Sequence, residues 1–296
     1  MPHPQRNSIF VEDARILSHQ ALPGHQHVLR VQAPKLAVRA QPGCFAHLQC
    51  DPQLPLRRPM SVMRADPATG WVEFLYKNVG KGTALLAAKP AGDIFSIMGP
   101  IGQGFVPDPA RPLAMLLGGG VGIPPMVFLA GQLRAAEQDY RPLVLMGSEV
   151  PFPFTTRPSQ IMVPGLPDGV IGCMPLMEDW GIASRLTSTQ GWPGCFDGYI
   201  TDLARAWLKS LDATDLERVA IYSCGPVPML EASATLAAEF KVPCQVSLEE
   251  RMACATGGCA GCAIRVNTAQ GPAMRRACVD GPVFDAASID WQALPA

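Results

Sequence analysis

The chain has 296 residues, 48% of them hydrophobic, which is enough for two or three domains with substantial cores. Its 24 basic and 25 acidic residues give a formal net charge of −1, which excludes binding to nucleic acid or to an anionic membrane through an overall electrostatic field. Residues 1–14 lack the apolar segment of a secretory signal, so we expect a cytoplasmic protein without structural disulfides. The ten cysteines therefore need another explanation.

The first hundred residues contain several short strand candidates, separated by turn residues such as Asp66, Pro67 and Gly70. The candidates are residues 24–33, 43–50, 59–64 and 71–77. Their spacing predicts a small antiparallel β-barrel.

After the Pro- and Gly-rich residues 99–112, the pattern changes to alternating strands and helices. We expect strands over 113–117, 143–146 and 219–223, and helices over 124–137 and 226–240. This alternation predicts a parallel α/β sheet. Residues 112–133 carry no charge and are long enough to cross a bilayer, but their central glycines and prolines argue against a membrane span.

These patterns predict an α+β multidomain chain. We place an N-terminal β-barrel domain at 1–106, an α/β nucleotide domain at 107–242 and a small module at 243–296. Because the last module is rich in cysteine and glycine, we expect it to be organised by a bound group rather than by hydrophobic burial.

Four cysteines of this module have the spacing of a metal centre. Cys254, Cys259 and Cys262 are arranged as C-x4-C-x2-C, and Cys278 follows after fifteen residues. This matches the ligand spacing of plant-type [2Fe-2S] ferredoxins. Three glycines in the loop permit sharp turns and a close approach of backbone N–H groups to sulfur: Gly257, Gly258 and Gly261. A structural zinc site, and disulfides or inert thiols, remain as alternatives.

Two turns in the α/β half lead from a strand into a helix, LLGGGVGIPP at 116–125 and YSCGPVPML at 222–230. Such turns can bind a pyrophosphate at the helix N-terminus, and ligands of open α/β sheets collect at this edge. The candidate residues are Gly118, Gly119, Gly120, Gly122, Cys224, Gly225 and Pro226. The alternative at both sites is a tight turn without a ligand.

The barrel half offers further phosphate-binding candidates. Arg58 and Ser61 lie in RRPMSV, and Gly82 and Thr83 lie at the predicted start of a helix in LYKNVGKGTALL. The alternatives are a surface arginine and an ordinary capping threonine. All five histidines lie in the first fifty residues, and we interpret them as surface or loop residues without a catalytic role.

Together these segments, in this order over residues 43–291, resemble the electron-transfer subunits of type B dihydroorotate dehydrogenase, a family of the ferredoxin reductase superfamily. The most specific segments are RRPMSV, GKGT, GPIGQGF, GGGVGIPP, SCGPVPML, VPCQVSLEERMACATGGCAGCAIRV and CVDGPVF. The resemblance implies FAD in the barrel, NAD in the nucleotide domain and a [2Fe-2S] cluster in the C-terminal module.

The resemblance also implies a role for each matching residue. It assigns the flavin to Arg58, Pro59, Met60, Ser61, Leu75, Tyr76, Lys77, Gly82 and Thr83. It assigns the cluster to Cys254, Cys259, Cys262 and Cys278, and more loosely the nicotinamide nucleotide to the two glycine-containing turns. It also allows the thiol of Cys224 to lie near the flavin edge, with a buried spectator as the alternative. Near the expected adenosine ribose, the carboxylate of Glu149 would repel a 2′-phosphate, which favours NAD over NADP.

By the same resemblance, the chain is an NAD-linked flavin iron-sulfur oxidoreductase subunit that works in pyrimidine biosynthesis. It would pass electrons between NAD and a separate FMN-containing dihydroorotate dehydrogenase subunit, in a heterotetramer, and would be unable to oxidise dihydroorotate alone. We expect the partner to dock around residues 254–262, the cluster loop. Two alternatives remain: an NAD(P)H:ferredoxin or sulfide dehydrogenase-type reductase subunit, and a non-catalytic iron-sulfur redox sensor or adaptor.

Overall fold

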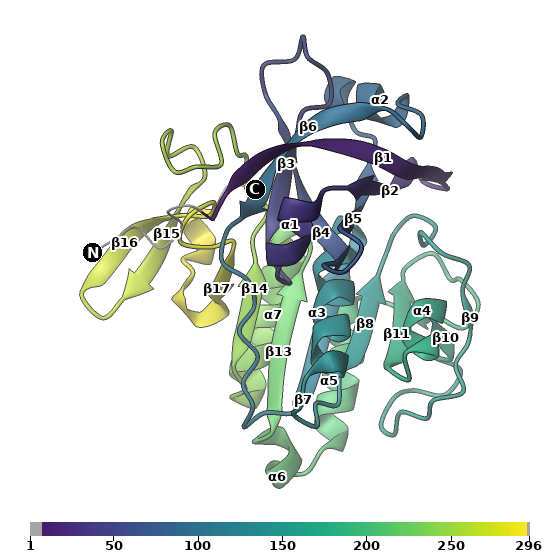
Figure 1. Ribbon diagram of the computed structural model, residues 1–296. Coiled ribbons are helices and arrows are strands. Elements are labelled where there is room, and N and C mark those ends of the chain that lie inside the picture. The colour runs from purple at the N-terminus through teal and green to yellow at the C-terminus, as the bar shows by residue number, and fades with distance from the viewer. Residues whose placement is uncertain (1–7, 295–296) are drawn as a thin grey trace.

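The computed structural model describes residues 8–294. Residues 1–7 and 295–296 lie outside the described residues, and with them His3 and the first half of the N-terminal segment considered for a secretory signal. The chain forms a closed barrel, a seven-stranded sheet and a C-terminal module with a two-stranded sheet (Figure 1). This architecture confirms the predicted fold class.

The barrel has six antiparallel strands in the order β1-β2-β5-β4-β3-β6. They are β1 (Phe10–Leu22), β2 (Gln26–Gln32), β3 (Phe45–Leu48), β4 (Arg58–Asp66), β5 (Trp71–Lys77) and β6 (Ile94–Ile101). Alternate residues such as Val72, Phe74 and Tyr76 point into the barrel core, as the two-residue period of a strand requires. Two short helices accompany the barrel, α1 (Pro34–Arg39) and α2 (Lys81–Ala87).

The seven-stranded sheet has the order β12-β11-β8-β7-β13-β14-β17, and only its last strand runs antiparallel. Its strands are β7 (Leu113–Gly119), β8 (Leu143–Gly147), β11 (Ala183–Ser188), β12 (Phe196–Asp197), β13 (Val219–Cys224), β14 (Cys244–Ser247) and β17 (Val283–Asp285). Central strands such as β7 and β13 are buried along nearly their whole length, which explains their uninterrupted apolar sequences.

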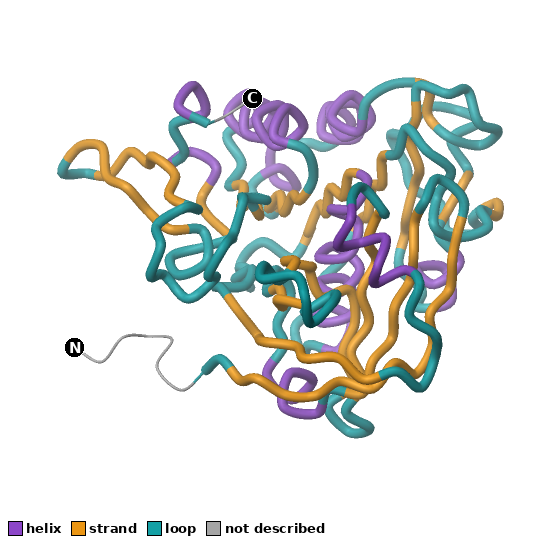
Figure 2. Tube along the Cα trace, turned by 90° about the horizontal axis from the view of Figure 1, so that it is seen from above, coloured by secondary structure: helices purple, strands orange, loops and turns teal. Residues whose placement is uncertain are grey.

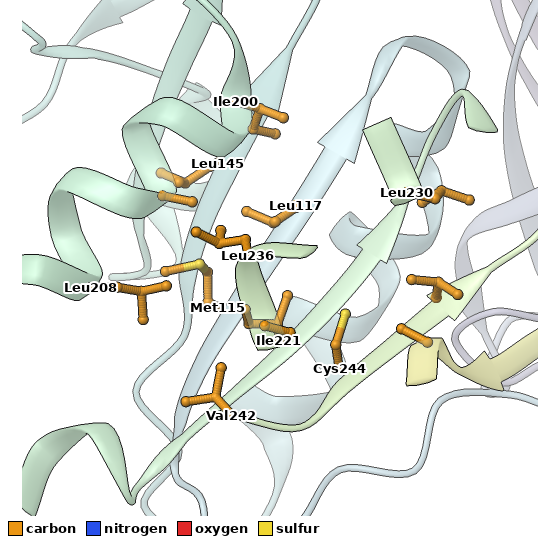
Figure 3. Packing of buried hydrophobic residues seen from close by; sticks show 14 of the residues in the cluster. Met115, Leu117, Leu145, Ile200, Leu208, Ile221, Leu230, Leu236, Val242 and Cys244 are labelled. Carbon is orange, nitrogen blue, oxygen red and sulfur yellow. The ribbon is translucent and has the colours of Figure 1, made fainter. Parts of the chain in front are cut away.

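Helices cover both faces of this sheet. On one face α3 (Ile123–Ala135) packs in a hydrophobic cluster with Leu116 and Val144. On the other, α5 (Ile200–Ser210) and α7 (Val227–Phe240) pack against Met115, Leu117 and Ile221 (Figure 3). The remaining elements are β9 (Arg157–Pro158), β10 (Gly172–Cys173), α4 (Pro175–Asp179), α6 (Ala213–Leu216) and η1 (Gly120–Gly122). No helix within residues 8–294 is both long and apolar enough to cross a bilayer.

The C-terminal module contains the hairpin β15 (Ala263–Thr268) and β16 (Gly271–Arg276), which projects from the body of the molecule (Figures 1 and 2). Strand β17 then returns to pair with β14, and the single-turn helices η2 (Ala286–Ser288) and η3 (Trp291–Ala293) follow. The predicted division of the chain at residue 243 remains a prediction. In the structure β14 lies beyond that boundary, yet it hydrogen-bonds within the nucleotide domain's sheet.

Candidate functional site

A cavity of about 630 Å³ lies between the barrel and the carboxyl ends of the parallel strands. Strands β3, β4 and β5 form its barrel side, and Val121 together with residues 247–252 forms the other side. The predicted flavin residues that line it are Arg58, Pro59, Met60, Ser61, Leu75, Tyr76, Lys77 and Thr83. The cavity thus brings together two sequence motifs that lie on different strands.

Gly82 lies behind Arg58 instead of on the cavity surface. A β-carbon at Gly82 would come within 2.7 Å of Nε and 2.9 Å of Cζ of Arg58. The arginine also donates from Nη1 to the carbonyl oxygen of Leu56 at 2.7 Å. Its guanidinium is therefore held over the first turn of α2 while it lines the cavity, an arrangement that fits the pyrophosphate of a flavin dinucleotide.

The hydroxyl of Thr83 hydrogen-bonds to the backbone that precedes α2. Its Oγ1 accepts from the N–H groups of Val79 at 3.0 Å and Gly80 at 3.1 Å, and lies 3.1 Å from Oδ1 of Asn78. These contacts match the alternative interpretation of Thr83 as a capping residue. The threonine therefore shapes the turn, and a ligand would meet the turn's backbone.

The glycine-rich turn after β7 packs against the turn after β13, because the two strands are neighbours. A β-carbon at Gly122 would collide with the carbonyl oxygen of Cys224, and one at Gly119 would collide with Sδ of Met229. These two glycines are required by packing between the turns, whereas the sequence interpretation had assigned them to ligand approach.

The other glycines of the two turns differ in their surroundings. Gly118 and Gly225 are also crowded, by Ile123 and Met229 respectively. Gly120 has a positive φ of 55°, and a β-carbon there would meet no atom within 4 Å. Of the glycines in these two turns, Gly120 is the one with open space beside its backbone, where the sequence predicts a nucleotide. Pro226 is exposed on the neighbouring turn.

Cys224 is fully buried at the end of β13. Burial, reinforced by the nearby carboxylate of Glu249, raises the pKa of its thiol well above the ordinary value. Glu249 raises and Ser247 lowers the pKa of this thiol. Both residues line the cavity, whereas Cys224 itself does not. The thiol thus lies behind the cavity wall, and its proximity to a flavin stays a prediction.

The cluster loop folds two cysteines close to one another near the surface. The N–H of Cys259 donates to Sγ of Cys254 at 3.4 Å, and the N–H of Gly261 donates to Sγ of Cys259 at 3.4 Å. Ala255 and Ala260 both have a φ of 55°, an uncommon conformation for residues with a β-carbon. Such local strain is typical of a loop wrapped around a functional group.

The electrostatics of the loop suit thiolate ligands. Burial opposes ionisation of Cys254, but hydrogen bonds from Thr256 and Cys259 outweigh it and lower its pKa to about 6. Burial and the adjacent thiol of Cys262 raise the pKa of Cys278 to about 12, so this thiol needs a cation to ionise. The donor set therefore fits a thiolate-bound metal centre, which includes an iron-sulfur cluster.

The four sulfurs form two pairs, Cys254 with Cys259 and Cys262 with Cys278. Within residues 8–294, no group of three or more potential ligands converges on a point suitable for a single metal ion. Two adjacent pairs are what two irons with two thiolates each require, so the arrangement favours a [2Fe-2S] cluster over mononuclear zinc. Cys259 is exposed, whereas Cys262 and Cys278 are buried.

The sequence interpretation missed the wall of the cavity that precedes the cluster loop. Residues 247–252 line the cavity, and Phe45 joins them from β3. Glu249 is exposed at the cavity surface, and desolvation by the protein packed around its carboxyl raises its pKa. The only signal in the sequence was the position of SLEERM between a buried strand and the first cluster cysteine.

The interpretation of the histidines as surface or loop residues was wrong for His47. His47 is buried on β3, where burial lowers its pKa to about 4. His19 lies with Nε2 2.8 Å from the hydroxyl of Tyr76, and the ring of His27 stacks on Tyr76 with centroids 5.1 Å apart. Since Tyr76 lines the cavity, these two histidines support a flavin motif from behind.

Glu149 follows β8 at the edge where the adenosine ribose was expected. Its carboxylate accepts from the hydroxyl of Thr189 and from Nε2 of Gln190 at 3.2 Å. These hydrogen bonds, that of Thr189 foremost, lower the pKa of Glu149. A carboxylate fixed in its charged form is consistent with the predicted preference for NAD over NADP.

Known proteins resemble the chain over almost its whole length. A family model described as the iron-sulfur cluster binding domain of dihydroorotate dehydrogenase B matches residues 249–290. The electron transfer subunit of dihydroorotate dehydrogenase B (NAD(+)) from Desulforamulus reducens is 30% identical over 297 residues, covering 95% of this chain and 99% of that protein. The subunit of the same name from Bacillus caldolyticus is 33% identical over 287 residues, covering 94% and 98%.

Solved structures agree with this result. The structure of an NADH-dependent reduced ferredoxin-NADP oxidoreductase, described in connection with flavin-based electron bifurcation, has a TM-score of 0.73 and 26% identity, covering 94% of this chain and 90% of that one. The ferredoxin reductase of carbazole 1,9a-dioxygenase, at 20% identity and a TM-score of 0.57, shares the fold. By its fold, its cysteine pairs and its full-length similarity, the chain belongs to the family of electron-transfer subunits of dihydroorotate dehydrogenase B.

Proposed function

We propose that this chain transfers electrons between NAD and an FMN-containing dihydroorotate dehydrogenase subunit, in pyrimidine biosynthesis, using one FAD and one [2Fe-2S] cluster. The observation that carries the proposal is the shared wall of the cavity. The RRPMSV motif lines one side, and residues 247–252, which lead directly to Cys254, line the other. This shared wall supports a flavin site and a cluster site next to each other in one chain.

When bound, FAD can exchange a hydride equivalent with NAD and single electrons with an iron-sulfur cluster. The residues of this chain supply binding and orientation. Arg58 neutralises phosphate charge, Ser61 and the backbone of β5 hold the flavin, and Gly120 opens the turn after β7 to the nicotinamide nucleotide. Glu249, whose pKa is raised by burial, can hold a proton at the cavity wall as the charge in the cavity changes.

The partner subunit docks, in this proposal, where the exposed cysteine pair reaches the surface. Cys259 is exposed and Cys254 is partly so, whereas the other pair faces the protein interior. The chain does not oxidise dihydroorotate alone, because its relatives are named as electron transfer subunits of a larger enzyme. We place the resulting heterotetramer in the cytoplasm, consistent with ten free cysteines.

The test is to purify the chain alone and together with an FMN-containing dihydroorotate dehydrogenase subunit. We expect a visible spectrum of flavin and [2Fe-2S], acid-extractable FAD, two irons per chain, and NADH-dependent reduction of a dye by the chain alone. Reduction of NAD by dihydroorotate should need both subunits. A colourless zinc protein would reject the proposal, and flavin plus iron without NADH activity would favour the redox sensor.

A second candidate function is that of a reductase subunit that serves another electron acceptor. It is supported by the similarity to an NADH-dependent ferredoxin-NADP oxidoreductase over 94% of the chain. The partner separates the two functions. Copurification with a ferredoxin-linked subunit, together with no coupling to the FMN subunit, would favour the second candidate.

A further inference from the structure

Between the flavin cavity and the buried cysteine pair lies a wall of apolar side chains. The hydrophobic cluster around that pair contains Cys262, Cys278, Ala255, Val279 and Phe45 in its buried part. Met252 packs against the same cluster from its edge. Of these residues, Phe45 and Met252 also line the flavin cavity. They therefore belong to both sites.

The backbone holds Phe45 firmly in this position. On β3 it pairs with Ser61 of the flavin motif on one side and with Ile101 of β6 on the other. The side chain of Phe45 is 4% exposed, and its ring lies 6.0 Å from the ring of the buried His47. Because Ala46 and Leu48 point into the barrel core, Phe45 points outward from the barrel, toward the cysteine module.

Met252 approaches the same wall from the other polypeptide segment. It precedes Cys254 by two residues and follows the stretch 247–250, which lines the cavity. An unbranched thioether side chain fills irregular gaps well, which suits a seam between a barrel and a loop. The segment after β6 is hydrogen-bonded to the C-terminal module, because the N–H of Gln103 donates to the carbonyl oxygen of Gly281 at 2.5 Å.

We propose that Phe45 and Met252 are the positioning residues that form the packed medium through which each electron passes between FAD and the buried pair Cys262 and Cys278. The inference rests on the proposed function. For each electron, the flavin would lose one electron as one ferric ion of the cluster became ferrous. Two such transfers, with the cluster reoxidised by the partner subunit in between, would take both electrons of one hydride received from NADH, and its proton would leave to solvent. The two side chains keep this gap short, filled and free of water.

The alternative is that the two residues only stabilise the fold. Two neighbours distinguish these roles, because Met98 and Phe284 pack against the same hydrophobic cluster but do not line the cavity. They serve as matched controls for Met252 and Phe45. Phe45→Ala removes most of a buried side chain and puts folding at risk, so Phe45→Leu is the milder second variant.

The experiment uses the protein with FAD and cluster bound, with neither NADH nor the partner present. The flavin is reduced by a light flash with an external photoreductant, and the flavin and cluster absorbances are then followed as the electron equilibrates. The circular dichroism of the cluster and the flavin and iron contents are recorded beforehand on every variant.

We expect Phe45→Ala and Met252→Ala to slow this equilibration about tenfold, and Phe45→Leu to slow it a few-fold, because a cavity replaces close-packed atoms. Static spectra and cofactor contents should be unchanged, and Met98→Ala and Phe284→Leu should equilibrate at the wild-type rate. Wild-type rates in the Phe45 and Met252 variants, or equal slowing in the controls, would overturn the inference. A wild-type chain that contains no flavin or no iron would instead reject the proposed function.

Discussion

The contact between Arg58 and Gly82 is a residue-scale feature with a direct consequence for flavin binding. A β-carbon at position 82 would displace the guanidinium, since it would lie 2.7 Å from Nε. We expect Gly82→Ala to weaken FAD binding by about 2 kcal/mol, or ~30-fold, the typical worth of a hydrogen bond to a charged group.

Flavin retention during gel filtration and the Kd for FAD measure this effect. Gly258→Ala is the matched control, because a β-carbon there meets nothing within 4 Å and Gly258 does not line the cavity. If both variants keep FAD equally well, Arg58 is not held by Gly82 in the way described.

Glu249 predicts a dependence of stability on pH. Burial raises its pKa above the ordinary 4.5, so its carboxyl contributes most to stability when protonated. That contribution is complete below about pH 4.5 and is lost as the pH rises through the pKa of the folded state. Glu249→Gln should therefore gain stability relative to the wild type as the pH rises from about 4 to about 8.

Urea unfolding, followed by tryptophan fluorescence across this pH range, tests the prediction. Glu149→Gln provides a control of opposite sign, because hydrogen bonds lower the pKa of Glu149 and its contribution is present above the ordinary pKa and lost as the pH falls. If the free energy of unfolding of the two variants, each relative to the wild type, changed with pH in the same direction, the raised pKa of Glu249 would be refuted.

Single residues were the least predictable level of the molecule. The predicted flavin residues on β4 and β5 line one cavity, and the sequence singles them out because they form contiguous motifs. Phe45 and His19 could not, because their roles arise from strand pairing between distant segments. A buried phenylalanine or a histidine in a strand carries no local signal of its neighbours.

At the scale of elements, the cysteine loop depends on one of its adjacent glycines more than on the other. Gly257 has a φ of 83°, and a β-carbon there would lie 2.6 Å from Cγ2 of Val279. Gly258 has open space around it. We expect Gly257→Ala to cost about 1–3 kcal/mol of backbone strain and to lose most of the iron, whereas Gly258→Ala keeps it.

Iron content and the visible circular dichroism of the two variants give the measurement. Equal loss of iron from both would mean that the loop needs general flexibility instead of one left-handed residue.

Strands and helices with strong patterns were largely predictable. The segment 71–77 coincides with β5, and α3 and α7 begin within a residue or so of their predicted prolines. Of the barrel strands, the predictions omitted β1 and β6. In β1 only Ala14 and Ile16 are buried, so its thirteen residues lack the alternation that signals a strand.

For the whole molecule, the order of the two cysteine pairs defines the route that electrons take in the proposed function. Cys262 belongs to the buried pair on the flavin side. In Cys262→Ser a hard oxygen replaces a soft thiolate, so the cluster should be impaired while the flavin site is intact. NADH should still bleach the flavin, but coupling to the partner should fail.

Flavin absorbance and partner-coupled NAD reduction measure the two steps separately. Unchanged coupling in Cys262→Ser would show that electrons bypass the cluster. The three-part architecture itself could be predicted from the sequence, whereas the docking of its parts could not, because it depends on contacts such as Gly102 against Pro282 that join residues far apart in the chain.

Strand β17 also links iron supply to aggregation. It comes from the module organised by the cysteines, yet it covers the outer edge of β14, a strand with apolar residues such as Val246. If the module loosens when iron is scarce, that edge is uncovered and can pair with other chains. Under iron starvation the protein would then be prone to aggregate, in addition to being unable to transfer electrons through the cluster.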